Sequence, residues 1–191
     1  MLSWGPRPLG VDLSLYRTVI GVDVGMKGAI AALGTKLAMP MVWDMPCAER
    51  GVDMDGLKAI LGQFNPHDTL AYLENNTARP GEVPDFAFRF GLHTGMLWGT
   101  LWTGGFTLRP IAPQKWKGQL GLPGKTHANA VEICAAYFDE KFPAFKHLIR
   151  GPRGGLLDGR IDALCIAYYG WLGETSLCGH MGGKRPIRRQ I

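Results

Sequence analysis

The sequence has no apolar run long enough to cross a membrane, which excludes a helical membrane protein. A transmembrane helix needs roughly 18 or more consecutive apolar residues. The first fifteen residues, MLSWGPRPLGVDLSL, lack the charged start and apolar core of a secretory signal, and also the Arg- and Ser-rich amphipathic pattern of an organelle transit peptide. We therefore expect a loose leader over residues 1–16 and a cytoplasmic protein with no membrane partner.

Cysteine is scarce as well, and its spacing argues against a disulfide framework. The four cysteines form no C-x-x-C pair and lie mostly among apolar residues, at positions 47, 134, 165 and 178. Free, buried thiols in a reducing compartment fit this pattern better. No internal repeat, low-complexity block or interdomain linker interrupts the 191 residues, a length that suits one sizeable core. We expect a single folded domain.

Positive charge is concentrated in the second half of the chain. The net charge is +5, yet residues 1–108 carry 8 basic and 10 acidic side chains, a net of −2. Residues 109–153 carry 8 basic and 3 acidic side chains, a net of +5, and residues 154–191 carry 5 and 3, a net of +2. This distribution favours a surface that binds a polyanion, although a solvated basic surface would give the same counts.

The order of the apolar runs predicts a mixed β-sheet. Three β-rich runs between residues 18 and 45, separated by short turns, are typical of an antiparallel meander: TVIGVDV, GAIAALG and KLAMPMVWDM. Two later runs, TLAYLEN and FTLRPIA, predict further strands, and helical periodicity is found at 53–64, at 84–102, from near Thr126 to Phe138, and at 157–172. A meander followed by parallel crossovers predicts an α/β fold, with a mixed five-stranded sheet of three antiparallel and two parallel strands and helices on both faces.

Acidic residues stand where two of these strands end and where the last helix begins. Asp23 follows a β-branched run that should be buried, and Glu74 ends the fourth strand. Asp158 and Asp162 are four residues apart and share one face of a helix. If the first and fourth strands are neighbours, these carboxylates meet, and hard oxygen ligands of this kind suit Mg²⁺ or Mn²⁺. Taken alone, Asp23 is equally compatible with an Asp-x-Gly turn at a strand end.

Four segments, in this order, resemble the motifs of the RuvC-type Holliday junction resolvases: IGVDVGMKGAIAAL, YLEN, PQKWKGQLGLPGKTHANAVEICAAYF and DGRIDALCIAYYG. The stretch FRFGLHTGMLWGTLWTGGFTLRPIAPQKWK is especially similar to the monokaryotic-chloroplast branch and its bacterial and phage relatives. The resemblance covers residues 17–173, leaves 174–191 as a basic tail, and implies a ribonuclease H-like fold. It also implies an Mg²⁺-dependent endonuclease that resolves four-way DNA junctions in recombination and repair.

The resemblance also implies roles for individual residues. It makes Asp23, Glu74, Asp158 and Asp162 the catalytic metal ligands, with two Mg²⁺ ions per site that Mn²⁺ can replace. Lys117 and Lys125 match basic residues that the family uses on the DNA and near the scissile phosphate, and Lys125 is a catalytic candidate. The bacterial resolvases usually space the last two acids by three residues, whereas the spacing here is four. Which of the two holds the second ion is left open.

Two further expectations concern partners. The basic segment and the tail KRPIRRQ should contact DNA phosphates, through Lys115, Lys117, Lys125, Arg150 and Arg153. We expect Trp116 to pack under the loop rather than stack on a base. The helix at 84–102 carries large apolar residues around most of its circumference, so one side should remain for a second copy of the chain, as a homodimer.

Other functions fit parts of the same pattern. GVDVGMKGA resembles the first phosphate loop of the actin and sugar-kinase superfamily, but those proteins need two such domains around a cleft and this chain has room for one. A different ribonuclease H-like nuclease, acting on an RNA–DNA hybrid, a flap or a single strand, fits the same four acids. A non-catalytic junction-binding protein would have no need of all four.

Overall fold

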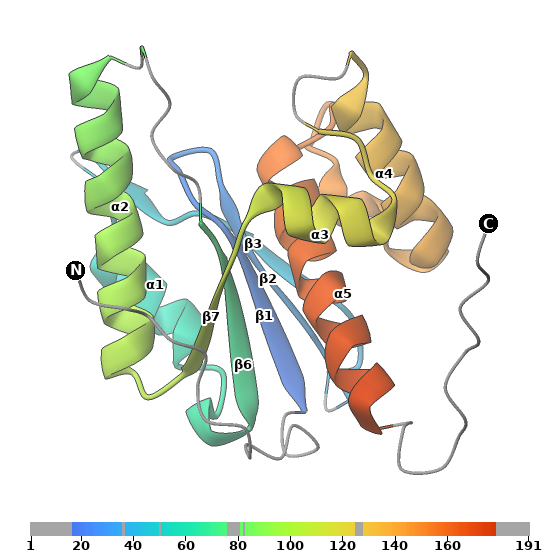
Figure 1. Ribbon diagram of the computed structural model, residues 1–191, viewed down its shortest axis with the longest axis horizontal. Coiled ribbons are helices and arrows are strands. Elements are labelled where there is room, and N and C mark those ends of the chain that lie inside the picture. Colours follow the sequence, from blue (N-terminus) through green and yellow to red (C-terminus); the bar gives the residue numbers. More distant parts are fainter. Residues whose placement is uncertain are drawn as a thin grey trace, which may run out of the picture.

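The computed structural model describes residues 17–35, 37–49, 51–75, 81, 83–124 and 128–178, with the backbone alone for 174–178. Its centre is a five-stranded sheet in the order β3-β2-β1-β6-β7. The strands are β1 (Thr18–Asp23), β2 (Ala29–Gly34), β3 (Met41–Asp44), β6 (Thr69–Glu74) and β7 (Thr107–Ile111). β1, β2 and β3 form the antiparallel meander, and β6 and β7 run parallel to β1 (Figure 1). The predicted mixed sheet is confirmed.

Helices cover both faces of this sheet (Figure 1). On one side lie α1 (Met54–Leu61) and α2 (Pro84–Thr103). On the other lie α3 (Pro113–Leu120), α4 (Ala130–Lys141) and α5 (Asp158–Cys178). Two 3₁₀ segments, η2 (Pro66–Asp68) and η3 (Pro143–Ile149), precede β6 and α5. Within the described ranges, no helix is both long enough and apolar enough to span a membrane.

Alternation along the strands divides the interior into two apolar clusters. In β1, Val19 faces the cluster formed with α3, α4 and α5, whereas Ile20 and Val22 face the cluster formed with α1 and α2. All six β1 residues are buried because helices cover both faces. This explains why β1 reads as a continuous apolar run rather than as alternation. The burial of Asp23 at its end is therefore a consequence of the architecture.

Two glycines let α5 approach the sheet closely. A Cβ on Gly21 of β1 would lie 2.3 Å from the carbonyl oxygen of Ala163 and 2.4 Å from the amide nitrogen of Ala167. A Cβ on Gly159 would lie 2.1 Å from the carbonyl oxygen of Lys27, in the turn between β1 and β2. Contacts this short exclude any side chain, so the backbone of α5 rests directly on β1 and on this turn. The start of α5 is thereby held beside Asp23.

The structure differs from the sequence-based expectation in three local details. The helix expected from near Thr126 is described from Ala130, after Asn129 with a left-handed φ of 66°. The segment PQKWKGQLGL, whose pattern predicts no element class, contains α3, which starts with Pro113 in its first turn. A short hairpin, β4 (Cys47–Ala48) and β5 (Gly51–Val52), lies before α1 and was not predicted. Its strands of two residues are too short to show alternation.

Candidate metal centre

Asp23 and Glu74 meet because β1 and β6 are parallel neighbours in register. Val22 pairs with Leu73, so the next residue of each strand carries a carboxylate at the same edge of the sheet. Asp23 is 8% exposed and Glu74 is fully buried. The condition for the two acids to meet, that the first and fourth strands are neighbours, is therefore met.

Asp162 comes to the same place from α5. One carboxylate oxygen from each of Asp23, Glu74 and Asp162 lies within 4.8 Å of the other two. Asp162 is 1% exposed, as expected for an acid followed by an apolar helical run. Asp158, one turn earlier on α5, is exposed and is not one of these three residues. The structure thus brings together three of the four predicted acids.

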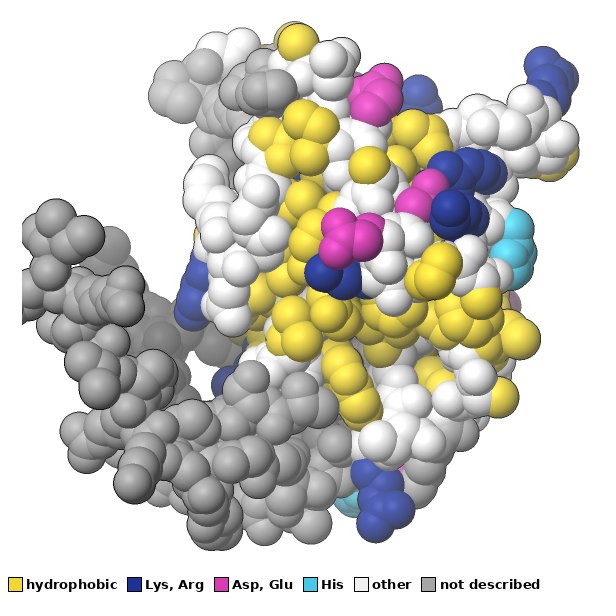
Figure 2. Space-filling view, turned by 90° about the vertical axis from the view of Figure 1, so that its right-hand side faces the viewer, with side chains coloured by type: hydrophobic (Ala, Val, Ile, Leu, Met, Phe, Trp, Pro, Cys, Tyr) yellow, Lys and Arg dark blue, Asp and Glu magenta, His cyan; other side chains and the backbone are white. Residues whose placement is uncertain are grey.

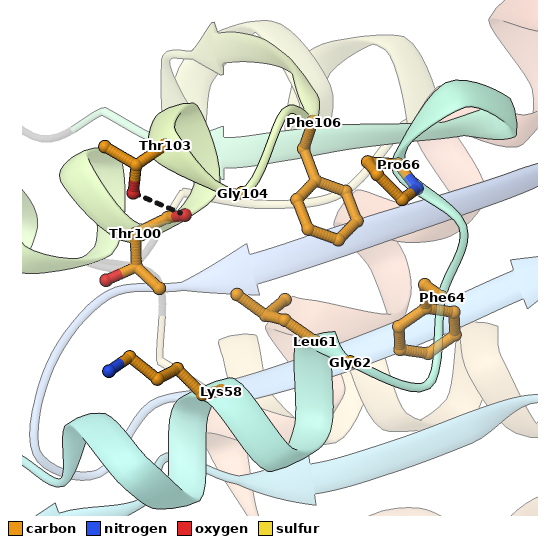
Figure 3. A pocket seen from close by; sticks show the side chains of 9 residues that line it. All are labelled: Lys58, Leu61, Gly62, Phe64, Pro66, Thr100, Thr103, Gly104 and Phe106. Atoms are coloured by element: carbon orange, nitrogen blue, oxygen red, sulfur yellow. Dashed lines mark hydrogen bonds between the residues drawn. The ribbon is translucent and has the colours of Figure 1, made fainter.

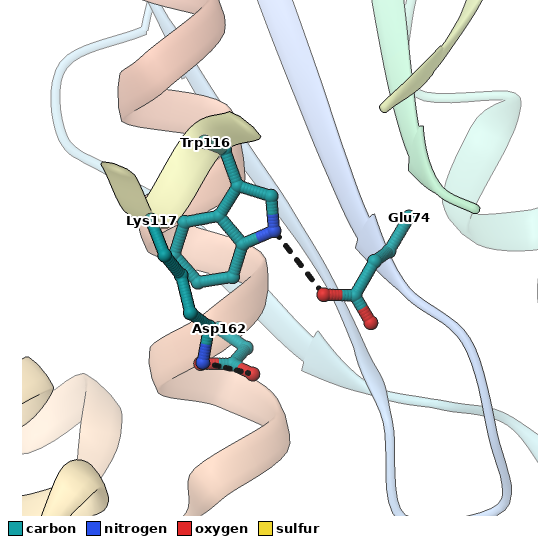
Figure 4. A network of polar contacts seen from close by, with 4 residues as sticks. All are labelled: Glu74, Trp116, Lys117 and Asp162. Atoms are coloured by element: carbon teal, nitrogen blue, oxygen red, sulfur yellow. Dashed lines mark hydrogen bonds and ion pairs between the residues drawn. The ribbon is translucent and has the colours of Figure 1, made fainter. Parts of the chain in front are cut away.

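Two neighbouring residues of α3 hold two of these carboxylates (Figure 4). The indole Nε1 of Trp116 donates a hydrogen bond of 3.1 Å to Oε1 of Glu74. The ammonium group of Lys117 lies 3.3 Å from both carboxylate oxygens of Asp162 and 4.7 Å from the centroid of the Trp116 ring. Trp116 is fully buried and Lys117 is 4% exposed. The expectation that Trp116 packs inside is confirmed, but its bond to Glu74 was not predicted.

The three acids of this cluster are close enough to repel one another when ionised, and the described contacts place the Lys117 ammonium group beside Asp162. A divalent cation among the three carboxylates would offset that repulsion. The donor set consists of hard oxygen atoms, which is the set that Mg²⁺ and Mn²⁺ prefer. The residues therefore fit the predicted metal.

Cysteines near the cluster do not alter this donor set. Burial raises the pKa of the Cys134 thiol, and it raises the pKa of the Cys165 thiol well above the ordinary value. Both thiols therefore stay protonated near neutral pH, and a protonated thiol is a poor metal ligand. Both are free and buried, as the sequence predicts, whereas Cys47 is exposed. Carboxylate oxygens remain the candidate metal ligands at this site.

The predicted DNA-contacting residues occupy different environments. Lys115 and Arg153 are exposed. Arg150 donates to both carboxylate oxygens of Asp139 and to the carbonyl oxygen of Lys146, so its charge is already paired. Lys117 is buried beside Asp162 rather than exposed on the surface. Lys125, the leader 1–16 and most of the tail lie outside the described residues.

Charged side chains are scattered over the face of the molecule that α4 and α5 form. In Figure 2, the Lys and Arg side chains on the described part of this face are separated from one another by apolar side chains, and some lie beside acidic side chains. Arg150 paired with Asp139 and Lys141 paired with Glu140 are examples of this arrangement. The basic excess of residues 109–153 is therefore partly neutralised within the protein.

A surface hollow lies away from the acid cluster, where the ends of α1 and α2 meet (Figure 3). Leu61, Phe64 and Phe106 line it, together with Lys58 and the threonines of the last turn of α2. Phe106 precedes β7 and Phe64 precedes β6, whereas Asp23 and Glu74 end their strands. The hollow is thus at the opposite end of the sheet, and the described residues that line it include no acid. It contributes nothing to the acid cluster.

The sequence matches no protein-family model and no curated protein. Solved structures do match. Thermus thermophilus RuvC in complex with a Holliday junction substrate has a TM-score of 0.57 at 14% identity, covering 86% of this chain and 97% of that one. The chain has the RuvC-type fold. A second Thermus thermophilus RuvC structure gives 0.52 at 18% identity, covering 85% and 96% of the two chains.

The similarity extends to a eukaryotic protein. The yeast mitochondrial Holliday junction resolvase Ydc2 has a TM-score of 0.54 at 17% identity, covering 87% of this chain and 81% of that one. The ribonuclease H-like fold implied by the sequence motifs is thereby confirmed. The particular likeness to the chloroplast branch stays a prediction, because none of these structures belongs to that branch by its description.

Proposed function

We propose that this protein is a metal-dependent endodeoxyribonuclease that cleaves four-way DNA junctions. The observation that carries the proposal is the convergence of Asp23, Glu74 and Asp162, buried at one edge of a RuvC-type sheet. A purely structural protein has little use for a buried cluster of three carboxylates, whereas a phosphodiesterase needs such a cluster to hold its cations. The two Thermus RuvC structures and Ydc2 support the fold that this chemistry requires.

Asp23, Glu74 and Asp162 would hold Mg²⁺, or Mn²⁺ in its place. Asp158, exposed on the same face of α5, is the candidate ligand for a second ion. The ions would polarise the scissile phosphate, lower the pKa of a bound water and stabilise the leaving oxygen. Cleavage by the Asp158→Asn and Asp162→Asn variants will show which of the two α5 acids is essential.

The remaining roles belong to cationic residues. The Lys117 ammonium, beside Asp162, is placed to keep that carboxylate oriented and to meet a phosphate that enters the cluster. Lys125 is proposed to stabilise charge at the scissile phosphate. Lys115, Arg150 and Arg153 are proposed to contact phosphates farther along the junction arms.

We extend the proposal to a homodimer, because a symmetric junction presents two strands to be cut and a two-fold dimer presents two sites. The exposed apolar side of α2 supports this assembly. Phe88, Leu92 and Trp102 are 70%, 44% and 58% exposed there, an apolar surface of the kind that marks interfaces.

The test is single-turnover cleavage of a synthetic four-way junction, compared with linear duplex, flap and RNA–DNA hybrid, in Mg²⁺ and in Mn²⁺. Asp23→Asn, Glu74→Gln and Asp162→Asn should reduce the cleavage rate by orders of magnitude. Junction affinity, measured in Ca²⁺, should stay or rise, because a negative charge facing the phosphate has gone. Asp158→Asn should cleave the junction more slowly than the unmodified protein if Asp158 helps to hold a second ion.

Two results would count against the proposal. If Asp23→Asn cleaves junctions at the unmodified rate, the acid cluster is not the active site. If the hybrid or the flap is cleaved faster than the junction, the protein is a different ribonuclease H-like nuclease.

A further inference from the structure

Glu74 presents two oxygens that are not equivalent. Its Oε1 accepts the indole N–H of Trp116, and one oxygen of the same carboxylate takes part in the acid cluster. Figure 4 shows the indole nitrogen directed at Oε1, with the second oxygen turned away from the ring. The carboxylate is thus held by one oxygen from the side of α3.

Trp116 is a rigid donor. It is fully buried, in the same apolar cluster as Ile111, Leu120 and Phe138, so the packed core fixes the position of its ring. The indole nitrogen can donate and cannot accept, so its polarity is not reversed by rotation of a hydroxyl or an amide. A tyrosine or glutamine in this place would lack that constraint. The orientation of Glu74 is therefore set by the core of the protein.

We infer that Trp116 is a positioning residue that holds Glu74 as a single-oxygen ligand and thereby favours Mg²⁺ over Ca²⁺ at the acid cluster. The inference rests on the proposed function, since it concerns the metal that this function requires. Mg²⁺ takes six ligands in near-ideal octahedral geometry, whereas Ca²⁺ takes six to eight oxygens and readily accepts both oxygens of one carboxylate. Binding by both oxygens requires the carboxylate to turn, and the hydrogen bond to the fixed indole resists that rotation.

The experiment measures metal binding without DNA or catalysis. The thermal-unfolding midpoint, Tm, is titrated with MgCl₂ and separately with CaCl₂ at constant ionic strength, because an ion that binds the folded state raises Tm according to its dissociation constant. Trp116→Phe keeps a buried aromatic ring and removes the N–H. A second variant replaces Trp116 by benzothienylalanine, which keeps the bicyclic shape and removes only the donor. If Trp116→Phe does not fold, the benzothienylalanine variant is used for the measurement instead.

Removal of the donor should weaken Mg²⁺ binding about tenfold, the usual effect of losing a partner of a metal ligand. Ca²⁺ binding should stay or strengthen, so that the ratio of the two affinities falls. Trp43→Phe is the matched control, because Trp43 packs edge-on against Phe64 with ring centroids 5.9 Å apart and lies in the cluster on the other face of the sheet. Its affinity ratio should equal that of the unmodified protein.

The possible failures are distinguishable. If both variants lower the two affinities equally, or leave them unchanged, Trp116 has only a packing role and the inference is overturned. If the unmodified protein shows no rise in Tm with either ion, or Asp23→Asn shows the same rise, the acid cluster is not a metal centre. In that case the proposed function fails together with the inference.

Discussion

The ammonium group of Lys117 lies 3.3 Å from both carboxylate oxygens of Asp162, and the side chains of both residues are almost completely buried. The pair joins α3 to α5 across 45 residues of sequence. It also places a cation inside a cluster of three carboxylates and so offsets part of their mutual repulsion. Two roles, orienting Asp162 and holding the cluster together, follow from one contact.

Replacing Lys117 by Met should destabilise the protein in metal-free buffer. The methionine fills a similar volume but leaves the Asp162 charge buried without its cation, which should lower the free energy of unfolding by about 3 kcal/mol. Added Mg²⁺ should recover more stability in this variant than in the unmodified protein, because the cluster is more negative. Urea denaturation with and without Mg²⁺ measures both effects.

Lys115→Met is the control, since Lys115 lies on the same helix and is exposed. Equal stability of the Lys117 and Lys115 variants would mean that the buried pair does not contribute.

The pair of Asp139 and Arg150 predicts a pH-dependent contribution to stability. The hydrogen bonds from Arg150, with its charge, hold the pKa of the Asp139 carboxyl below its ordinary value. A lowered pKa in the folded state stabilises the protein above the ordinary pKa near 3.9, and this contribution is lost as the pH falls through the lower folded value. Asp139→Asn should therefore cost roughly 1 kcal/mol at pH 7 and less at pH 3.

Denaturant unfolding at the two pH values checks this expectation. Glu140→Gln serves as the comparison, because the Glu140 side chain is 71% exposed. A difference between Asp139→Asn and the unmodified protein that is the same at pH 7 and pH 3 would refute the assignment.

The glycines of α2 offer a test of the proposed dimer. Gly91, Gly95 and Gly99 recur every four residues on its exposed side, and a Cβ at each would have no described atom within 4 Å. Gly95→Ala should therefore raise the stability of the monomer by up to about 1 kcal/mol, as expected in a helix interior. The same methyl group should hold two α2 helices apart and weaken the dimer about tenfold.

Sedimentation over a range of concentrations, with unfolding measured on the monomer, separates the two effects. Gly118→Ala is the matched control, since Gly118 is an exposed glycine of α3 with the same free space. A dimer unaffected by Gly95→Ala would exclude α2 as its interface. A protein that sediments only as a 20.9 kDa species and binds junction DNA as one monomer per junction would exclude the dimer itself.

The salt dependence of junction binding should distinguish basic residues that contact DNA phosphates from those whose charge is already paired within the protein. Lys115→Ala and Arg153→Ala should each lower the slope of log K against log salt by about 0.9, the value for one lost phosphate contact on duplex DNA. Arg150→Ala should change the slope less, because its guanidinium is already bound by Asp139. Lys58→Ala, on α1 at the other face of the sheet, should leave the slope unchanged.

Equilibrium binding in Ca²⁺ at several salt concentrations gives these slopes. If Lys115 and Arg153 behave like Lys58, the basic segment is a solvated surface and DNA is bound elsewhere.

Much of the fold and two ligands of the site follow from local patterns. Continuous burial, Gly-rich turns and the spacing of apolar residues predict the five strands in their order, and parallel neighbours bring the ends of β1 and β6 together. The proximity of Asp23 and Glu74 could therefore be predicted from the sequence. Each argument uses only periodicity and chain connection, which are properties of short segments.

The different environments of Asp158 and Asp162 could not be predicted in this way. Helical spacing puts both on one face, but their depth depends on where α5 meets the sheet, and the contact of Gly159 with the turn after β1 decides that. Charge counts placed Lys117 in a basic segment without indicating that it is buried. The bond from Trp116 to Glu74 spans 42 residues and depends on the position of α3, which no local pattern fixes.

Because the backbone of α5 lies directly on β1, the spacing between two acids of the cluster, Asp23 and Asp162, does not depend on the volumes of the surrounding core side chains. Because Gly21 brings main chain against main chain, the spacing between the Asp23 and Asp162 positions is set by peptide geometry, which varies little, and not by the volumes of neighbouring side chains. Large apolar residues on either face of the sheet can be exchanged for others of similar volume without moving the two acids relative to each other. The spacing of Asp23 and Asp162 is thus insensitive to most of these exchanges, and a methyl group would disturb it at Gly21 and at Gly159.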